Sequence, residues 1–297
     1  MPKRKFIDIE LREDERALET VAAASDSKGV DGSRGKTDKS DSVATDILFR
    51  RPGRLERIVG TDDRVRILNT EDYPFRMICK LTMQFPHDPN IYAGSGALIG
   101  PNIVLTCAHN VFEAGKGNAH TISCAPGQAD YNQTPFGEYK VKRILFPDEY
   151  KTSNLTKNDY AAIILDGSPG DDVGWFGYAA ASDTRLRNSK LNLTGYPGDK
   201  GGVQLWHHSS HPLEFDEHTM KYTADTFGGN SGGPIYSYYK DDPWPIIYGI
   251  HTYGATAWIE NGKVIIPEHN GGRRLDFECL EDIAEWRKIA ESMLPNC

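Results

Sequence analysis

Short runs of β-branched and aromatic residues alternate with turns rich in Gly, Pro, Asn and Asp from about residue 75 onward. Runs of this kind between turn residues predict strands. Many such strands at this spacing are typical of a β-barrel or a β-sandwich, so the pattern predicts an all-β domain. The expected strands are Phe75–Phe85, Tyr92–Ile99, Ile103–Thr106, Tyr139–Leu145, Ala161–Leu165, Lys190–Tyr196, Val203–His208, Thr219–Thr223, Gly233–Tyr238, Ile246–Thr252 and Lys263–Ile266.

Only the end of the chain has a clear helical period. Apolar residues recur at helical spacing in Glu278–Leu294, with Trp286 near the centre of the stripe. We expect a C-terminal α-helix that packs against the β-domain.

The first 56 residues have a different composition. Ser25–Ser42 consists largely of Gly, Ser, Asp and Lys and offers little to bury, which predicts disorder. Ile9–Val21 is a candidate for a short charged helix. We therefore expect a disordered leader, 1–56, acting as a prosegment, and a folded domain, 57–297.

Charge and composition narrow the function. The net charge is −8, and all of it lies beyond the leader, so an acidic domain argues against nucleic acid as a partner. No apolar run approaches the roughly 20 residues that a membrane helix needs, and no ordinary signal peptide is visible at the start. We expect a monomer that does not bind membranes.

The cysteines and clustered histidines do not indicate a metal site or a cofactor. The five cysteines are scattered without a CxxC pair, and their number is odd. Trp206–His211 holds three histidines without a carboxylate or cysteine companion at a telling distance, so a polar strand edge explains them better.

The stretch Asp225–Pro234 carries the strongest chemical signal, because Ser231 is flanked by glycines. A serine hydroxyl needs a base to remove its proton and donors to hold the oxyanion that forms. Glycines let backbone N–H groups approach a reacting carbonyl, so the N–H groups of Gly229 and Ser231 are candidates for an oxyanion hole. A Gly-rich turn between two strands would explain the same residues.

A base and an acid precede this serine. His109 lies at the exit of two expected strands, and an imidazole suits general base catalysis. Asp159 stands at the head of the buried strand Ala161–Leu165, where a carboxylate needs a partner. Each is also explained by an ordinary structural role.

The order His, Asp, Ser is the chymotrypsin order. With the blocks Thr106–His109, Asn158–Ala161, Gly195–Lys200, Gly228–Gly232 and Gly249–Thr252, the chain resembles a trypsin-like serine protease, and more closely the glutamyl endopeptidase family. The resemblance covers roughly Arg57 to Met293. It implies two six-stranded antiparallel Greek-key β-barrels, a His109–Asp159–Ser231 triad in the cleft between them, and polypeptide substrates.

The resemblance leaves two specificities open. In glutamyl endopeptidases, a Thr or Ser five residues before the nucleophile and a His in the Gly-Ile-His strand hold the substrate carboxylate, and Thr226 and His251 match them. Asp225, however, occupies the place where trypsins carry the Asp that attracts Lys and Arg. His251 favours glutamate before the scissile bond.

The same resemblance implies secretion and a zymogen cut within Arg54–Ile58. Cleavage after Glu56 would be self-processing, whereas cleavage after Arg57 needs a trypsin-like activating protease. Asn230 replaces the Asp that pairs with the freed amine in trypsins, which disfavours that ion pair. Asn110 follows His109 where animal relatives have a disulfide cysteine, so no disulfide is assigned.

Two other classes remain as alternatives. An α/β-hydrolase esterase would need a helix directly after Ser231, where Gly232–Tyr236 predicts a strand. A binding module with the protease fold and a silent site is disfavoured by the presence of all three triad residues.

Overall fold

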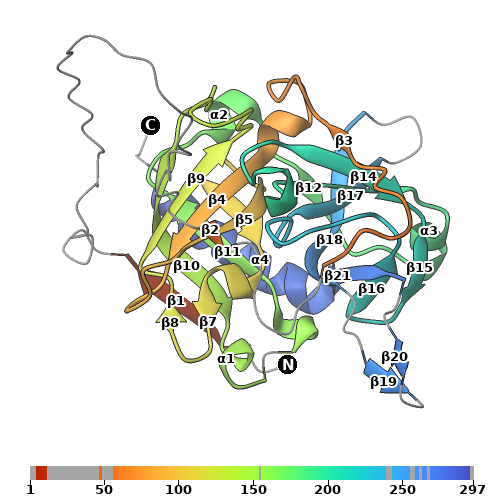
Figure 1. Cartoon of the computed structure of the whole chain (residues 1–297). Coiled ribbons are helices and arrows are strands. Elements are labelled where there is room, and N and C mark those ends of the chain that lie inside the picture. Colours follow the sequence, from red (N-terminus) through yellow and green to blue (C-terminus); the bar gives the residue numbers. More distant parts are fainter. Residues whose placement is uncertain are drawn as a thin grey trace, which may run out of the picture.

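The computed structural model describes residues 5–11, 47–48, 56–153, 155–238, 243–254, 258–260, 263–265 and 268–294. It is mostly β-structure in two units that lie side by side, with a long helix at the C-terminus (Figure 1). The all-β class and the C-terminal helix predicted from the sequence are confirmed.

The first unit is a closed barrel of six antiparallel strands. Strand β10 pairs with both β11 and β9, which joins the two ends of the ladder β10-β11-β6-β5-β4-β9. β11 is buried at every position and pairs with β6, so it forms the middle of the barrel wall. The strands are β4 (Ile78–Gln84), β5 (Ile91–Leu98), β6 (Ile103–Thr106), β9 (Thr121–Pro126), β10 (Tyr139–Pro147) and β11 (Ala161–Leu165).

The second unit is a curved sheet in the order β15-β16-β21-β18-β17-β13-β14-β3, with β12 beside β18. It has the shape of a half-barrel, and no strand pairing recorded for the described residues closes it. Its strands are β3 (Val65–Arg66), β12 (Gly177–Tyr178), β13 (Leu191–Gly195), β14 (Trp206–Ser210), β15 (Pro212–Phe215), β16 (Thr219–Tyr222), β17 (Pro234–Tyr238), β18 (Pro245–Gly254) and β21 (Asn270–Arg274).

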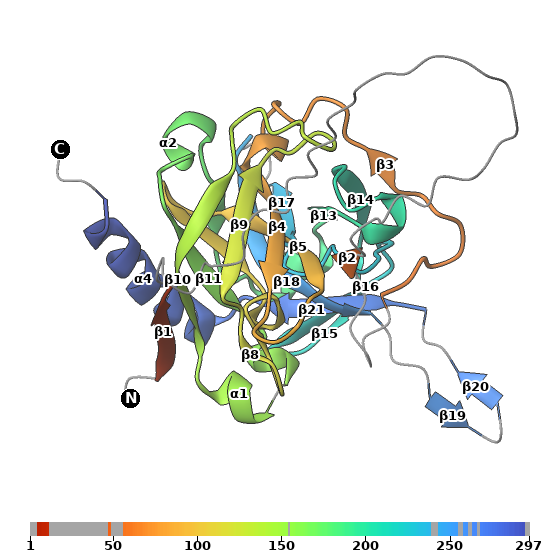
Figure 2. The same ribbon diagram turned by 60° about the vertical axis from the view of Figure 1, so that its left-hand side comes forward.

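Small hairpins and short helices complete the units. The hairpins are β7 (Phe112–Glu113) with β8 (Gly117–Asn118), and β19 (Trp258–Glu260) with β20 (Lys263–Ile265), which projects from the second unit (Figure 2). The short helices are α1 (Glu149–Ser153), α2 (Gly170–Val173) and α3 (Asp183–Arg187).

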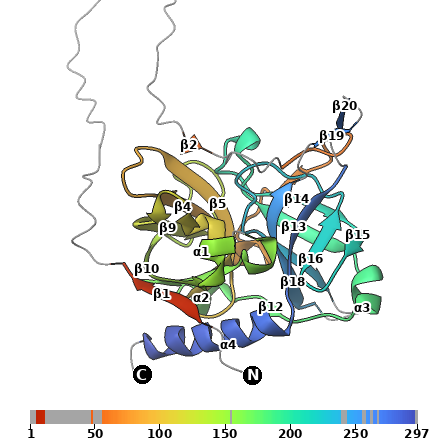
Figure 3. The same ribbon diagram turned by 90° about the horizontal axis from the view of Figure 1, so that it is seen from below.

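A continuous apolar core joins the two units and the C-terminal helix α4 (Phe277–Ser292). The Asp276 side chain accepts a hydrogen bond from Cys279 N and so caps the helix. Trp286 is fully buried, and its ring centroid lies 5.6 Å from that of Tyr160 in the first unit. In Figure 3, α4 runs along the lower edge of the molecule beside both units. Its buried side chains belong to the core that the two units share.

Part of the leader is built into the first unit. Phe6–Glu10 forms β1, antiparallel to β10, and Phe6 packs edge-on against Trp286. Ile47–Leu48 forms β2 beside β5. These two strands differ from the expected disordered leader. The edge of β10 that is not paired with β11 accepts β1, and the apolar residues of Phe6–Glu10 become partly buried there. The helix expected at Ile9–Val21 starts within β1, and its remainder from residue 12 onward lies outside the described residues.

Two further observations concern cysteines and membranes. The four cysteines that the structure describes, Cys79, Cys107, Cys124 and Cys279, are all buried, and none of them forms a disulfide with another described residue. Within the described ranges, no helix has the length and apolar character to span a membrane.

The role of β1 is testable by substitution. Phe6→Ser in the full-length chain removes the edge contact with Trp286 and should lower the free energy of unfolding by about 1–3 kcal/mol. Phe277→Ser is the matched control, because Phe277 is 79% exposed, and it should change stability by less than about 0.5 kcal/mol. Urea unfolding measures both, and equal losses would show that β1 adds nothing.

Candidate active site

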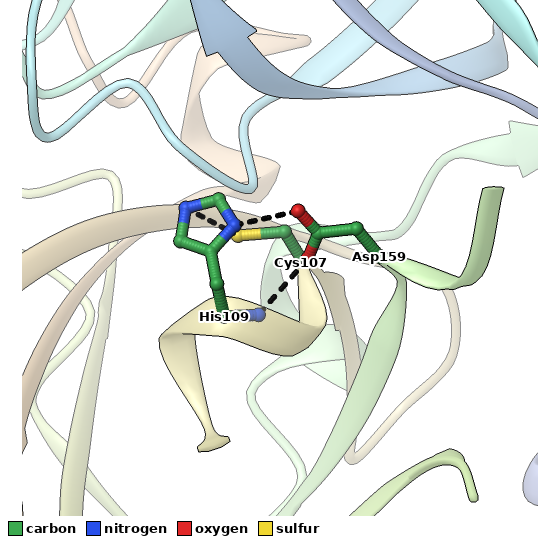
Figure 4. A group of neighbouring side chains, drawn as sticks. All are labelled: Cys107, His109 and Asp159. Carbon is green, nitrogen blue, oxygen red and sulfur yellow. Dashed lines mark hydrogen bonds and ion pairs between the residues drawn. The ribbon is translucent and has the colours of Figure 1, made fainter. Parts of the chain in front are cut away.

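Strand pairing brings His109 and Asp159 together. His109 lies in a 3-10 turn just after β6, and Asp159 comes just before β11, the neighbouring strand. Asp159 Oδ1 accepts a hydrogen bond from the His109 backbone N–H at 3.0 Å, and Oδ2 lies 2.8 Å from His109 Nδ1 (Figure 4). A carboxylate on Nδ1 keeps the proton there, so the Nε2 lone pair of neutral His109 is available as a base.

Cys107 borders the same imidazole. Its Sγ lies 3.4 Å from His109 Nε2, and the side chain is fully buried (Figure 4). The buried cysteine thus packs against the His109 imidazole ring.

The loop that carries Ser231 folds tightly because two glycines adopt left-handed conformations. Gly229 has φ 107° and Gly232 has φ 85°. A Cβ on Gly232 would overlap both Thr106 Oγ1 and the Ser95 carbonyl oxygen, so only glycine fits there. In the described part of the chain, no hydrogen bond is recorded for the N–H groups of Gly229 and Ser231. Both donors are thus available to an added oxygen.

Side chains of the first unit hold this loop in place. Ser95 Oγ donates to the Gly229 carbonyl at 2.7 Å, and Asn110 Nδ2 donates to the Ser231 carbonyl at 2.9 Å. Because Asn110 follows His109 directly, the nucleophile loop and the histidine share one anchor. The sequence analysis did not identify Ser95 or Asn110, since nothing local marks a residue that bonds across units.

Ser231 faces a carboxylate from the leader boundary. Its hydroxyl donates to Glu56 Oε1 at 2.7 Å, and Glu56 Oε2 lies 3.4 Å from His251 Nε2. The Glu56 side chain is only 5% exposed. A hydroxyl has one proton, so a Ser231 that donates to Glu56 does not donate to His109.

The pKa of Glu56 reflects these neighbours. Burial alone raises the pKa, but the nearby His251 imidazole, the hydrogen bond from the Ser231 hydroxyl and the charge of His109 outweigh it and hold the pKa below its ordinary value of 4.5. The charged form is therefore favoured in the folded chain. The stability it contributes is complete above pH 4.5 and is lost as the pH falls through the lowered pKa.

Three buried polar atoms belong to Glu56 and to two residues that contact the Glu56–Arg57 segment. They are Thr226 Oγ1, His251 Nε2 and Glu56 Oε2, and none has a hydrogen-bond partner among the described residues. His251 Nε2 and Glu56 Oε2 are 3.4 Å apart, which is close enough for an ion pair. The contact does not have hydrogen-bond geometry, so it is purely electrostatic. Thr226 donates through its backbone to Arg57, and His251 faces Glu56, so both residues lie beside the segment that reaches Ser231.

His251 is held from behind by a residue that the sequence analysis missed. Tyr222 Oη lies 2.6 Å from His251 Nδ1, and both side chains are buried. Tyr222 ends β16 and His251 lies in β18, with β21 between them. Only the strand order reveals this pair.

Asp225 binds backbone instead of lining the pocket with a free charge. Its Oδ1 accepts from Val59 N at 2.7 Å and its Oδ2 from Asp63 N at 2.9 Å. His208 Nδ1 lies 3.3 Å from Oδ2, and Asp225 is 1% exposed. Both oxygens are thus engaged by the segment that follows the leader.

The chain next to Glu56 is fixed as well. Asn270 accepts from Arg57 N at 3.1 Å and donates to Arg57 O at 2.8 Å. Thr226 N also donates to Arg57 O, at 3.2 Å. Arg57 is thereby placed on the wall of the pocket by both of its backbone polar groups.

A surface cavity of about 420 Å³ lies elsewhere on the second unit, and Ser231 does not line it. Arg274 within it donates to Asp183 Oδ1 and to the Asp216 carbonyl, so its charge is already matched.

Comparisons with known proteins identify the family. The family model described as Trypsin matches residues 79–269. A Bacillus subtilis protein described as "Extracellular metalloprotease" is 30% identical over 87% of this chain and 84% of its own length. A Bacillus licheniformis "Glutamyl endopeptidase" is 30% identical over 82% of this chain and 72% of its own length.

A solved structure gives the same result for the fold. The structure described as "Structure of Glu endopeptidase in complex with MPD" superposes with a TM-score of 0.65 at 27% identity, covering 78% of this chain and 99% of that one.

The requirement for glycine at position 232 yields a prediction. Gly232→Ala places a methyl group against the backbone of β5 and should cost about 3 kcal/mol or more. Gly201→Ala is the matched control, because Gly201 has φ 87° with nothing within 4 Å, and only the backbone strain of about 1–2 kcal/mol applies. Urea unfolding of the two variants measures the difference. Equal losses would mean that the loop relaxes away from β5.

Proposed function

The chain belongs to the trypsin family and is a serine endopeptidase, and from that premise we propose that it cuts after glutamate with a His109–Asp159–Ser231 triad. The observation that carries the glutamate preference is the Glu56 carboxylate between Ser231 Oγ and His251 Nε2. A pocket that accommodates a buried glutamate from the chain itself has the size and the donors for a substrate glutamate.

The chemistry follows from the positions of the groups. His109 Nε2 takes the Ser231 proton as Oγ attacks the substrate carbonyl carbon, and the carbonyl oxygen becomes an oxyanion held by the N–H groups of Gly229 and Ser231. His109 then gives that proton to the leaving amine, which leaves an acyl-enzyme on Ser231. Water, deprotonated by His109, attacks the ester and releases the new carboxyl end. One oxyanion donor typically lowers such a barrier by about 3 kcal/mol.

Asp225 gives the Arg and Lys alternative less support than the sequence suggested. Its two oxygens already accept from Val59 N and Asp63 N, so its charge is used on the backbone. Thr226 and His251 have unused donors in the same pocket. A carboxylate satisfies these donors, whereas a substrate cation leaves them unpaired.

We further propose that the uncut chain is latent. In it, the Ser231 proton is committed to Glu56, and the Glu56 side chain fills the pocket. The hydrogen bond of the Ser231 hydroxyl goes to the side-chain carboxylate of Glu56, so the hydroxyl is not poised for attack on a peptide bond. Cleavage within Arg54–Ile58 is therefore the work of a second molecule or of another protease, unless the segment first moves.

The name of the Bacillus subtilis relative raises metal-dependent hydrolysis as a second candidate. Two groups of side chains have ligand atoms within 4.8 Å of one another: Cys107, His109 and Asp159, and Asp63, His208 and Asp225. The Asp159 and Asp225 oxygens already accept hydrogen bonds from N–H groups. Neither group keeps an open set of ligands, so the residues do not fit a metal centre and we derive no step through one.

The specificity is tested with two peptides that differ only in Glu or Arg before the scissile bond. We expect the leader-free enzyme to cleave the Glu peptide faster, and His251→Ala to lower kcat/KM for it by about 10- to 100-fold through loss of a donor to a charged group. His211→Ala, an exposed histidine, is the control and should leave it unchanged. Faster cleavage after Arg by the unaltered enzyme would overturn the glutamate preference.

Latency is tested with a fluorophosphonate probe on the uncut chain. Glu56→Ala frees the Ser231 proton for His109, so the full-length band should be labelled about tenfold faster or more than in the unaltered chain. Glu71→Ala, an exposed glutamate, should label at the unaltered rate. His109→Ala in either background should abolish labelling of Ser231. Equal rates for Glu56→Ala and the unaltered chain would remove the blocking role of Glu56.

A further inference from the structure

The buried pair Tyr222 and His251 determines which imidazole nitrogen faces the pocket. Tyr222 Oη and His251 Nδ1 are 2.6 Å apart, and the two residues are 1% and 0% exposed. A pair buried to this degree is cut off from bulk solvent, so each polar atom needs a hydrogen-bond partner inside the molecule.

The direction of this hydrogen bond follows from counting protons. Burial, with the nearby charges of Tyr253 and Glu56, raises the pKa of Tyr222 well above its ordinary value, so the hydroxyl keeps its proton at neutral pH. If His251 Nδ1–H donated to Tyr222, the phenolic proton would need another acceptor, and the described residues provide no recorded one. The satisfied arrangement has Tyr222 O–H donating to the Nδ1 lone pair.

Neutral His251 then carries its single proton on Nε2, the nitrogen that faces Glu56 Oε2. In this tautomer the pocket offers an N–H donor to a carboxylate. In the other tautomer, the Nε2 lone pair would point at the carboxylate and repel it.

We propose that Tyr222 is a positioning residue for specificity: its hydroxyl fixes His251 as the Nε2–H tautomer, so that the pocket recognises a substrate carboxylate without a proton being added to His251. This inference rests on the proposed glutamate specificity and deepens it. It predicts that recognition of a carboxylate needs only the single proton that neutral His251 carries on Nε2.

Other charged groups near His251 act differently. Glu56 faces His251 from the leader boundary, and Tyr222 faces it from β16. Tyr253 of β18 acts on Tyr222. The His109 charge acts on Glu56. Among the facing groups, only Tyr222 is within hydrogen-bond distance of Nδ1 in the described residues, so its removal changes the tautomer while the other groups stay.

The experiment compares Tyr222→Phe with the unaltered leader-free enzyme on two peptides that differ in Glu or Gln before the cut, from about pH 5.5 to 8.5. Over this range the substrate Glu stays ionised, so a change in the ratio with pH reports on the pocket and not on the substrate. At about pH 8, the Glu-to-Gln ratio of kcat/KM should fall about tenfold or more in Tyr222→Phe. It should recover toward the unaltered value near pH 5.5, where the imidazolium donates from both nitrogens.

Tyr248→Phe is the matched control. Tyr248 is a buried tyrosine of β18 whose hydroxyl accepts from Arg185, away from His251, and its removal should leave the ratio and its pH profile unchanged. A Tyr222→Phe variant that loses activity equally on both peptides at every pH would overturn the proposal, because lost packing alone predicts that result.

The tautomer itself is measurable without activity. Long-range ¹H–¹⁵N spectra of histidine-labelled Ser231→Ala protein should show His251 as Nε2–H, and Tyr222→Phe in the same background should lose this preference. An Nδ1–H signal in the protein with Tyr222 present would overturn the proposal. Because the spectrum does not depend on the substrate, a preference for Arg peptides would defeat the glutamate specificity while leaving the role of Tyr222 to be decided by the spectrum.

Discussion

A carboxylate that leaves water must find donors inside the protein, and the active site is built around that constraint. Glu56 is almost fully buried, yet its pKa lies below the ordinary value. The Ser231 hydroxyl and His251 supply the compensation. When Glu56 leaves, the same donors remain in a buried pocket, and unpaired buried donors cost free energy. The proposed latency of the uncut chain and the proposed glutamate preference therefore share one cause, because both present a carboxylate to the same atoms.

The segment after Glu56 is anchored independently of it. Asn270 holds both backbone polar groups of Arg57, and Asp225 accepts from Val59 and Asp63. A cut beside Glu56 would thus free the leader without releasing the wall of the pocket. This arrangement also explains how an aspartate in the trypsin specificity position is compatible with a site for anions. Its two oxygens are engaged by the N–H groups of Val59 and Asp63 before they can act on a substrate.

The sequence was sufficient for elements whose signals are local. Strand β11 is a continuous apolar run, α4 has a helical stripe, and Gly229 and Gly232 mark a turn that needs left-handed glycines. Strand β21 was missed because its sequence, Asn-Gly-Gly-Arg-Arg, lacks β-branched residues. Those glycines are required by packing, since a Cβ on Gly272 would overlap the backbone of Ile250. A close approach between strands leaves no mark in the sequence other than the glycine itself.

The site was predicted in part for the same reason. His109 and Asp159 could be paired because β6 and β11 are recognisable strands, and the structure brings their side chains together. The sequence could not predict the roles of Tyr222, Asn270 and Glu56, because these roles depend on strand order and on the path of the leader boundary.

The hydrogen bonds between the two units hold the units together and also position the Ser231 loop. Ser95 reaches from the first unit to the Gly229 carbonyl, and Asn110 reaches to the Ser231 carbonyl. These hydrogen bonds fix the Gly229–Asn230 and Ser231–Gly232 peptide groups, which flank the peptide groups that carry the two candidate oxyanion donors. They lie directly against Gly232, where no side chain fits. An error of 1 Å at this junction would leave both units folded and still separate the base from the nucleophile, because catalysis depends on near-contact geometry. The apolar core and α4 bring the units together, but the polar contacts of Ser95 and Asn110 set the register in which a histidine of one unit can act on a serine of the other.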